Sequence, residues 1–163
     1  TKRIGELLCK LYSQNYSIPT TCFRLSTVYG ERGRKDMAVG KFTECILKGK
    51  SIPRFGDGRS KRDYVYIGDV IEAILKSLQQ PFDFEIIDIG SGRAISTNEL
   101  IELIEKETGK KARIKELPPP PNELPITLVG ISKAEKLLGW KPKVSIEEGI
   151  KRVCKAHQGK ELS

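Results

Sequence analysis

Apolar positions along the chain recur with two different periods. A spacing of three or four residues predicts an amphipathic helix over residues 1–15. Its apolar face carries Ile4, Leu7, Leu8 and Leu11. The same spacing predicts helices over residues 37–48 and 68–78, whereas short β-branched or alternating runs predict strands. These strands are expected over residues 20–25, 51–55, 62–66 and 84–89.

Three further helices are predicted from their first turns. A serine followed three residues later by glutamate is the sequence of a capping box, in which the two side chains satisfy free backbone N–H groups. The pairs are Ser96 with Glu99, Ser132 with Glu135, and Ser145 with Glu148. A short strand is expected over residues 112–115, and the four prolines at 118–121 predict a stiff extended connector. Because strands alternate with helices, the predicted class is α/β.

The charge of the chain is concentrated in its first two fifths. The 163 residues carry a net charge of +8, and residues 1–62 alone hold 14 Lys and Arg against 5 Asp and Glu. This surplus favours solvated surface or a phosphate-bearing partner. Nucleic acid is the less favoured partner, because the cations are scattered over predicted helices, strands and loops and aromatic residues make up only 7%.

Several kinds of site have no support in the composition. No apolar run approaches the ~18 residues of a membrane span, so no membrane partner is expected. No metal site is expected, since His157 is the only histidine and the cysteines match no zinc spacing. Reduced thiols in a cytoplasmic protein are the expectation for the four cysteines. They are Cys9, Cys22, Cys45 and Cys154.

Three stretches combine strand ends with glycine turns, where ligands of open parallel sheets bind. They are Arg-Leu-Ser-Thr-Val-Tyr-Gly at 24–30, Gly-Asp-Gly-Arg-Ser-Lys-Arg-Asp-Tyr-Val-Tyr at 56–66, and Asp-Ile-Gly-Ser-Gly at 88–92. Arg62 stands near the start of a predicted strand, and a guanidinium there can hold phosphate oxygens in a bidentate fashion. The alternative is an exposed basic turn with no ligand.

The order and spacing of these stretches resemble the C-terminal half of NAD-dependent nucleotide-sugar epimerases and dehydratases, in the extended short-chain dehydrogenase/reductase family. That family has Arg-x-x-Asn-Val-Tyr-Gly where this chain has residues 24–30. Residues 33–42 are most similar to UDP-sugar 4-epimerases of the glucose or glucuronate type. The matching segments cover nearly the whole chain and comprise residues 24–30, 56–69, 88–92, 131–142 and 147–150.

The resemblance implies a fold and a division into domains. It implies the C-terminal part of a Rossmann-type parallel sheet together with a small mixed α/β substrate-binding domain. Residues 1–30 and 68–92 would belong to the sheet, and residues 31–67 and 93–163 to the substrate-binding domain. The family's glycine-rich dinucleotide-binding units and its catalytic tyrosine would precede Thr1, so we expect a piece of a longer enzyme that is inactive by itself.

The resemblance also implies a chemistry. An NAD-dependent epimerase oxidises the sugar at C4, lets the 4-keto sugar rotate, and reduces it on the other face. Lys2 would be catalytic and cofactor-binding, holding the nicotinamide ribose and lowering the pKa of the tyrosine. Ser26 and Val28 would lie at the cofactor. Arg62 would hold the diphosphate of a UDP-sugar. The other substrate-binding residues would be Thr27, Val39, Lys41, Phe42 and Phe55.

Three positions depart from the family pattern. Thr27 stands where the family usually has asparagine, and Gly130 replaces an aspartate. A further diphosphate-binding arginine of the family is absent, because residues 120–123 read Pro-Pro-Asn-Glu. Lys41 or Arg59 is the expected substitute for that arginine.

Two other functions stay open at this stage. One is a nucleotide-sugar 4,6-dehydratase of the same family, which would need an acid–base pair upstream of Thr1. The other is a nucleotide-sugar binding module without catalysis, which would bind UDP-sugars without NAD. A homodimer is a further expectation, since the family pairs its subunits through the helix that contains Lys2.

Overall fold

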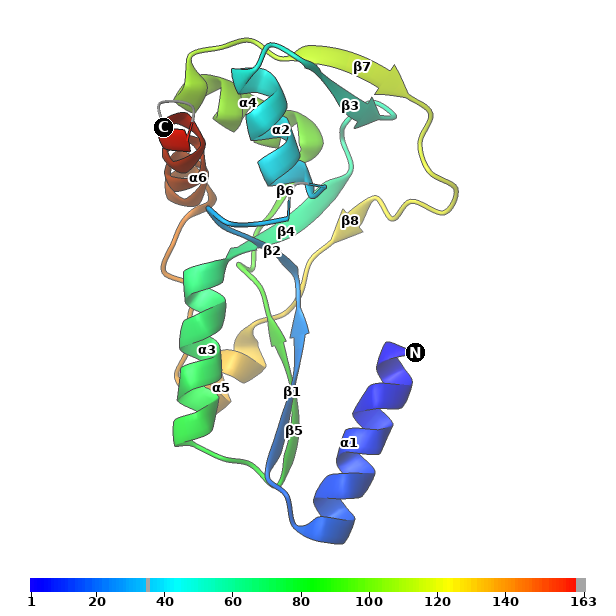
Figure 1. Cartoon of the computed structure of the whole chain (residues 1–163). Coiled ribbons are helices and arrows are strands. Elements are labelled where there is room, and N and C mark those ends of the chain that lie inside the picture. Colours follow the sequence, from blue (N-terminus) through cyan, green and yellow to red (C-terminus); the bar gives the residue numbers. More distant parts are fainter. Residues whose placement is uncertain (35, 161–163) are drawn as a thin grey trace.

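The computed structural model describes residues 1–34 and 36–160 and has an elongated shape (Figure 1). At one end the strand pair β1–β5 lies between α1 and α3, and at the other end α2, α4 and α6 pack together. The elements are α1 (Lys2–Tyr16), β1 (Thr20–Leu25), β2 (Thr27–Tyr29), α2 (Ala38–Leu47), β3 (Ser51–Phe55), β4 (Lys61–Tyr66), α3 (Ile67–Gln79), β5 (Phe84–Ile89), β6 (Ala94–Ser96), α4 (Thr97–Thr108), β7 (Arg113–Leu117), β8 (Ile126–Thr127), α5 (Ser132–Leu138) and α6 (Ile146–Lys160).

Parallel pairing dominates the strands. β1 runs parallel to β5, β3 to β7, and β4 to both β2 and β8, while β6 pairs antiparallel with β4. The predicted α/β class is confirmed. The stretch at 24–30, expected to be a strand end followed by a glycine turn, needs correction, because Thr27 begins the short strand β2 inside it. β2 contains three residues and pairs with β4. A strand of this length repeats too few positions for a two-residue period to show.

Buried side chains form two separate clusters. One is centred on β5, α3 and α5 and includes Ile87, Ala73 and the fully buried Trp140. The other joins α2, α4 and α6 and includes Ile46, Leu100 and Val153. The end of the molecule that contains the paired strands β1 and β5 therefore has its own core. Helix α5, from the C-terminal part of the sequence, belongs to this core. The domain boundaries derived from the resemblance stay a prediction.

Helix α1 packs through a different face from the one its apolar pattern predicts. Ile4, Leu7, Leu8 and Leu11 are all at least half exposed. The less exposed positions are Glu6, Cys9 and Ser13, which share the opposite face at helical spacing. Polar contacts hold that face on the strands, because Arg24 donates to both oxygens of Glu6 and the Ser13 hydroxyl donates to the Asp83 carbonyl.

The predicted capping boxes have different outcomes. At α4 both halves form: Glu99 N donates to Ser96 Oγ at 3.1 Å, and Ser96 N donates to Glu99 Oε2 at 2.7 Å. At α6 Glu148 N donates to Ser145 Oγ at 3.2 Å, while the Glu148 carboxylate accepts from Arg152. The box at α5 is wrong, because Ser132 is the first helical residue and Ile131 is the N-cap without a side-chain bond.

Ser96→Ala is expected to lower the free energy of unfolding by about 1 kcal/mol, because one N–H at the start of α4 loses its acceptor. Ser132→Ala is the matched control and should stay within about 0.5 kcal/mol of the parent, because Ser132 is exposed and caps nothing. Urea unfolding followed by circular dichroism measures both. Equal losses for the two variants would contradict the assignment of the caps.

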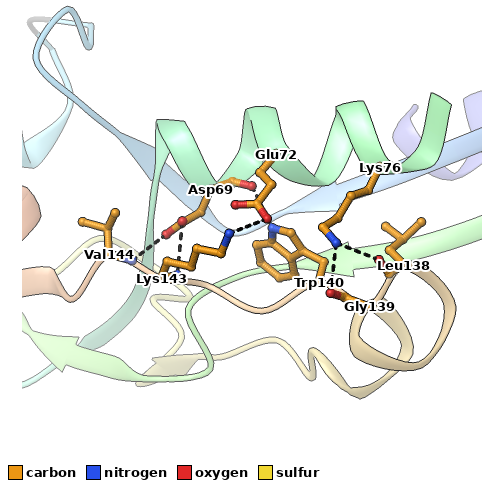
Figure 2. Close-up of polar contacts among 8 residues, drawn as sticks. All are labelled: Asp69, Glu72, Lys76, Leu138, Gly139, Trp140, Lys143 and Val144. Carbon is orange, nitrogen blue, oxygen red and sulfur yellow. Dashed lines mark hydrogen bonds and ion pairs between the residues drawn. The ribbon is translucent and has the colours of Figure 1, made fainter. Parts of the chain in front are cut away.

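A buried carboxylate holds the segment after α5 against α3 (Figure 2). The Asp69 carboxylate accepts from the backbone N–H groups of Lys143 and Val144, each at 3.1 Å. Trp140 Nε1 donates to the Asp69 carbonyl at 2.9 Å, and the Lys143 ammonium pairs with Glu72 at 2.8 Å. These bonds fix the connection that runs from α5 to the start of α6.

Helix α6 also contacts β2, the short strand that follows β1. Tyr29, the last residue of β2, is 5% exposed and packs against Gly149 of α6. A Cβ at Gly149 would lie 1.9 Å from the Tyr29 hydroxyl oxygen, so the absence of a side chain is required there. Two motifs far apart in sequence, Val-Tyr-Gly at 28–30 and Glu-Glu-Gly-Ile at 147–150, therefore meet in the structure.

Candidate functional site

Strand β4 separates two cavities by the alternation of its side chains. Arg62 and Tyr64 line a cavity of about 220 Å³, named here the Arg62 cavity. Asp63, between them, lines a cavity of about 530 Å³, named here the Ser26 cavity. Since successive side chains of a strand point to opposite faces, one short strand supplies a cation to the first cavity and an acid to the second.

The Ser26 cavity lies where β1 ends and β2 begins. Ser26 N donates to the Ile89 carbonyl at 2.8 Å, which holds this junction beside the end of β5. The Ser26 hydroxyl oxygen is buried and has no hydrogen-bond partner among the described residues. A buried hydroxyl without a partner is costly unless a ligand or water satisfies it. The lining residues are Leu25, Ser26, Thr27, Val28, Arg34, Met37, Asp63, Thr127 and Val129.

Asp63 fixes the walls of the Ser26 cavity. It is 1% exposed, and its Oδ1 accepts from the backbone N–H and the hydroxyl of Ser91 at 2.8 and 2.7 Å. Val129 N lies 3.5 Å from Asp63 Oδ2. Gly90 allows this approach, because a Cβ there would lie 2.5 Å from Asp63 Oδ2. The carboxylate thus joins three chain segments and acts as a support rather than as a free acid.

The Arg62 cavity gathers four of the predicted substrate-binding residues. Lys41 and Phe42 come from α2, Phe55 from the end of β3, and Arg62 from β4. The remaining described lining residues are Asp36, Ala38, Pro53, Ser60, Tyr64, Thr97 and Glu123. Helix α2, the end of β3 and strand β4 therefore supply two cations and three aromatic rings, those of Phe42, Phe55 and Tyr64, to one cavity.

The other predicted site residues lie elsewhere. Ser26, Thr27 and Val28 line the Ser26 cavity, as described above. Val39 is 3% exposed, packs in the core formed by α2, α4 and α6, and is not among the described residues that line either cavity. Lys2 is exposed at the start of α1 and is not among the described residues that line either cavity. The roles of all these residues stay predictions.

The Arg62 guanidinium has three hydrogen bonds inside the chain. Its Nη1 donates to the carbonyls of Lys61 and Leu124 at 2.9 and 2.8 Å. Its Nη2 donates to Glu123 Oε1 at 3.1 Å. Arg62 is therefore not an exposed basic turn: its position is fixed by the segment that precedes β8.

Acidic side chains pair with six of the cations in the described part of residues 1–62. Arg34 and Asp36 form an ion pair at 2.5 Å that joins the linings of the two cavities, and the guanidinium lowers the pKa of that carboxyl. Burial raises the pKa of Tyr64 in the Arg62 cavity. The ion pairs of this region are Arg24–Glu6, Arg34–Asp36, Lys48–Glu44, Arg54–Glu116, Arg59–Asp57 and Arg62–Glu123.

Two observations concern other kinds of site, within residues 1–34 and 36–160. No three His, Cys, Asp or Glu side chains lie close enough together to hold a metal ion. No helix there has the length and apolarity that a membrane crossing needs.

The four cysteines are free thiols, and burial raises the pKa of Cys154 to about 11.

The sequence does not single out several of the lining residues individually. Thr127 and Val129 follow the proline connector, where β8 contains only two residues. Asp63 belongs to a predicted strand, but only the folded chain shows that its carboxylate reaches Ser91 and Val129. The Glu123 contact joins side chains 61 residues apart. A pattern of spacing could have indicated only the inward or outward face of Asp63.

Comparison with known proteins gives a family match and several relatives. The model of the NAD dependent epimerase/dehydratase family matches residues 1–90. An uncharacterized protein of Methanocaldococcus jannaschii is 46% identical over 94% of this chain and 47% of its own length. The UDP-glucuronate 4-epimerase of Thermodesulfobacterium geofontis is 42% identical over 93% of this chain and 47% of its own length. The chain spans about half the length of the curated relatives it matches.

Solved structures give the same picture. A UDP-glucose 4-epimerase with UDP-glucose from Thermotoga maritima superposes with a TM-score of 0.89 at 33% identity, over 97% of this chain and 52% of that one. A UDP-glucuronic acid 4-epimerase from Bacillus cereus in complex with UDP-glucuronic acid and NAD has a TM-score of 0.88 at 36% identity, over 98% of this chain and 51% of that one.

Proposed function

This chain belongs to the NAD dependent epimerase/dehydratase family, and on that premise we propose that it is the substrate-binding part of an NAD-dependent UDP-sugar 4-epimerase. The observation that carries the proposal is the Arg62 cavity, where two cations and three aromatic rings from α2, β3 and β4 meet. Relatives and solved neighbours that are named UDP-sugar 4-epimerases support it.

The residues of the Arg62 cavity fit the parts of a UDP-sugar. The Arg62 guanidinium and the Lys41 ammonium are the cations that a diphosphate needs, and Arg62 can offer two N–H donors to it at once. Phe42 and Phe55 offer apolar ring surface to the uracil or to the sugar. Lys41 is thereby our candidate for the cation that replaces the missing family arginine.

The Ser26 cavity fits the reacting end of the substrate and the cofactor. The buried Ser26 hydroxyl has no hydrogen-bond partner among the described residues and can therefore bond to a ligand. Thr27 and Val28 line the same cavity. NAD, when bound, accepts and returns the hydride at C4 of the sugar. In this proposal Ser26 and Thr27 orient polar groups of the two ligands, and Lys2 contacts the cofactor ribose. The resemblance gives the role of proton acceptor to a tyrosine, whose pKa Lys2 would lower.

Arg62→Gln is expected to weaken the binding of UDP-glucose or UDP-glucuronate by about tenfold to a hundredfold, because a charged group loses its charge-assisted bonds to the diphosphate. Arg59→Gln removes the same charge from an exposed side chain outside the lining and should leave the affinity unchanged. Isothermal titration calorimetry of the 163-residue chain measures both. Equal affinities for the parent and Arg62→Gln would contradict the proposal that the diphosphate binds in this cavity.

Two expectations from the resemblance remain part of the proposal. The exposed apolar residues of α1 support the homodimer, since the resemblance assigns this helix to the subunit interface. The cytoplasmic location stays a prediction. The dehydratase and the non-catalytic binding module are less favoured, because the named relatives above are 4-epimerases.

A further inference from the structure

The binding site proposed above already contains an anion from its own chain. Glu123 Oε1 accepts from Arg62 Nη2 at 3.1 Å, and both side chains are mostly shielded, with 22% and 28% exposed. An ion pair in partial shelter from water is stronger than one on the open surface. A diphosphate that binds Arg62 at this nitrogen is brought close to the Glu123 carboxylate, and the repulsion between the two anions favours displacement of the carboxylate.

Glu123 lies in a segment that is fixed at both ends. This proline segment, residues 118–125, connects β7 to β8, and its ends are held by Gly56 N to the Leu117 carbonyl at 2.9 Å and Lys61 N to the Pro125 carbonyl at 2.8 Å. Neither bond involves the Glu123 side chain. The carboxylate can therefore leave Arg62 while the two strands keep their partners.

The charges and the volume of the Arg62 cavity also indicate that Glu123 moves when a diphosphate binds. Its lining holds Lys41 and Arg62 against Asp36 and Glu123, so the positive and negative side chains balance. A diphosphate placed at Arg62 would be repelled by a carboxylate that stayed beside it. The volume of about 220 Å³ is also small for a nucleotide-sized ligand, because small-molecule sites typically enclose about 300–1,000 Å³.

We propose that Glu123 is an internal competitor that occupies Arg62 until the diphosphate of the substrate displaces it. The exchange sets the affinity of the site and opens the cavity as the carboxylate moves away. This inference rests on the proposed function, since it concerns the regulation of the same site. An acid that contacts a ligand favourably would weaken binding when its charge is removed. For Glu123 we expect the opposite, so removal of its negative charge should strengthen the binding of the diphosphate.

The test uses the 163-residue chain with two probes, inorganic pyrophosphate and UDP, titrated by calorimetry at low ionic strength. Glu123→Gln keeps the shape of the side chain and removes its charge, so both probes should bind about three- to tenfold more tightly. Glu116→Gln is the matched control, because Glu116 also pairs with an arginine, Arg54, but lies outside the lining of the Arg62 cavity. It should leave both affinities unchanged.

The other outcomes separate the inference from the proposed function. Unchanged affinities in Glu123→Gln would overturn the competition. Weaker UDP binding with unchanged pyrophosphate binding would also overturn it, since the carboxylate would then hold the nucleoside. If Arg62→Gln bound UDP as well as the parent, the proposed function itself would fail. Melting curves by circular dichroism show that each variant is folded.

Discussion

Replacement of Trp140 by alanine is expected to lower the free energy of unfolding by about 3–5 kcal/mol. The indole is fully buried in the core cluster of β5, α3 and α5, so the substitution leaves a large cavity there. It also removes the bond from the indole N–H to the Asp69 carbonyl. Urea unfolding followed by circular dichroism measures the loss, because Trp140 is the only tryptophan and its fluorescence disappears with it.

Trp140→Phe separates the two contributions. It keeps an aromatic ring in the cluster and removes the N–H donor, so a loss of about 1–2 kcal/mol is expected. If Trp140→Ala cost less than about 1 kcal/mol, the segment that Asp69 holds would be only loosely attached to α3. The clamp drawn in Figure 2 would then have no energetic role.

Gly149→Ala is expected to lower the free energy of unfolding by about 3 kcal/mol, at the upper end of overpacking effects. The new methyl group would meet the Tyr29 hydroxyl at 1.9 Å and its ring carbons at 2.7 and 2.8 Å. Tyr29 is buried and cannot move without shifting β2. The same variant should therefore weaken UDP-sugar binding, because β2 carries Thr27 and Val28. Unfolding curves and calorimetry on one protein preparation measure both effects.

Two controls accompany that substitution. Gly159→Ala lies in the same helix, where an added Cβ meets nothing within 4 Å, so stability should be unchanged or slightly raised. Tyr29→Phe removes a buried hydroxyl that has no partner among the described residues and should recover part of the loss in the Gly149→Ala background. A stability of Gly149→Ala equal to that of Gly159→Ala would contradict the packing of Tyr29 on α6.

The elements that could be predicted are those whose signals lie within one segment. The helices α2 and α3 follow from periodicity, α4 from the complete Ser96 box, and the strands β1 and β5 from short β-prone or β-branched runs. β2, β6 and β8 have two or three residues and exist only through pairing with β4. A pattern along the chain cannot indicate a strand that depends on a partner from elsewhere.

The same distinction holds for faces and for the site. The apolar stripe of α1 predicts the wrong packing face, because Glu6 and Ser13 on the opposite face bond to Arg24 of β1 and to Asp83, the residue before β5. The resemblance singles out Arg62, Lys41, Phe42 and Phe55, and the structure brings their side chains to one cavity. It could not give the pairing of Arg62 with Glu123, because that contact depends on the path of the proline segment.

Because side chains alternate along β4, the number of residues in the preceding turn determines which side chain faces each cavity. Arg62 faces one cavity and Asp63 the other, and a shift of one residue in strand register exchanges the two faces. A chain that lost one residue between Phe55 and Lys61 would present an acid where the diphosphate is proposed to bind. Insertions and deletions in residues 56–60 are therefore tolerated only if the register of β4 is kept.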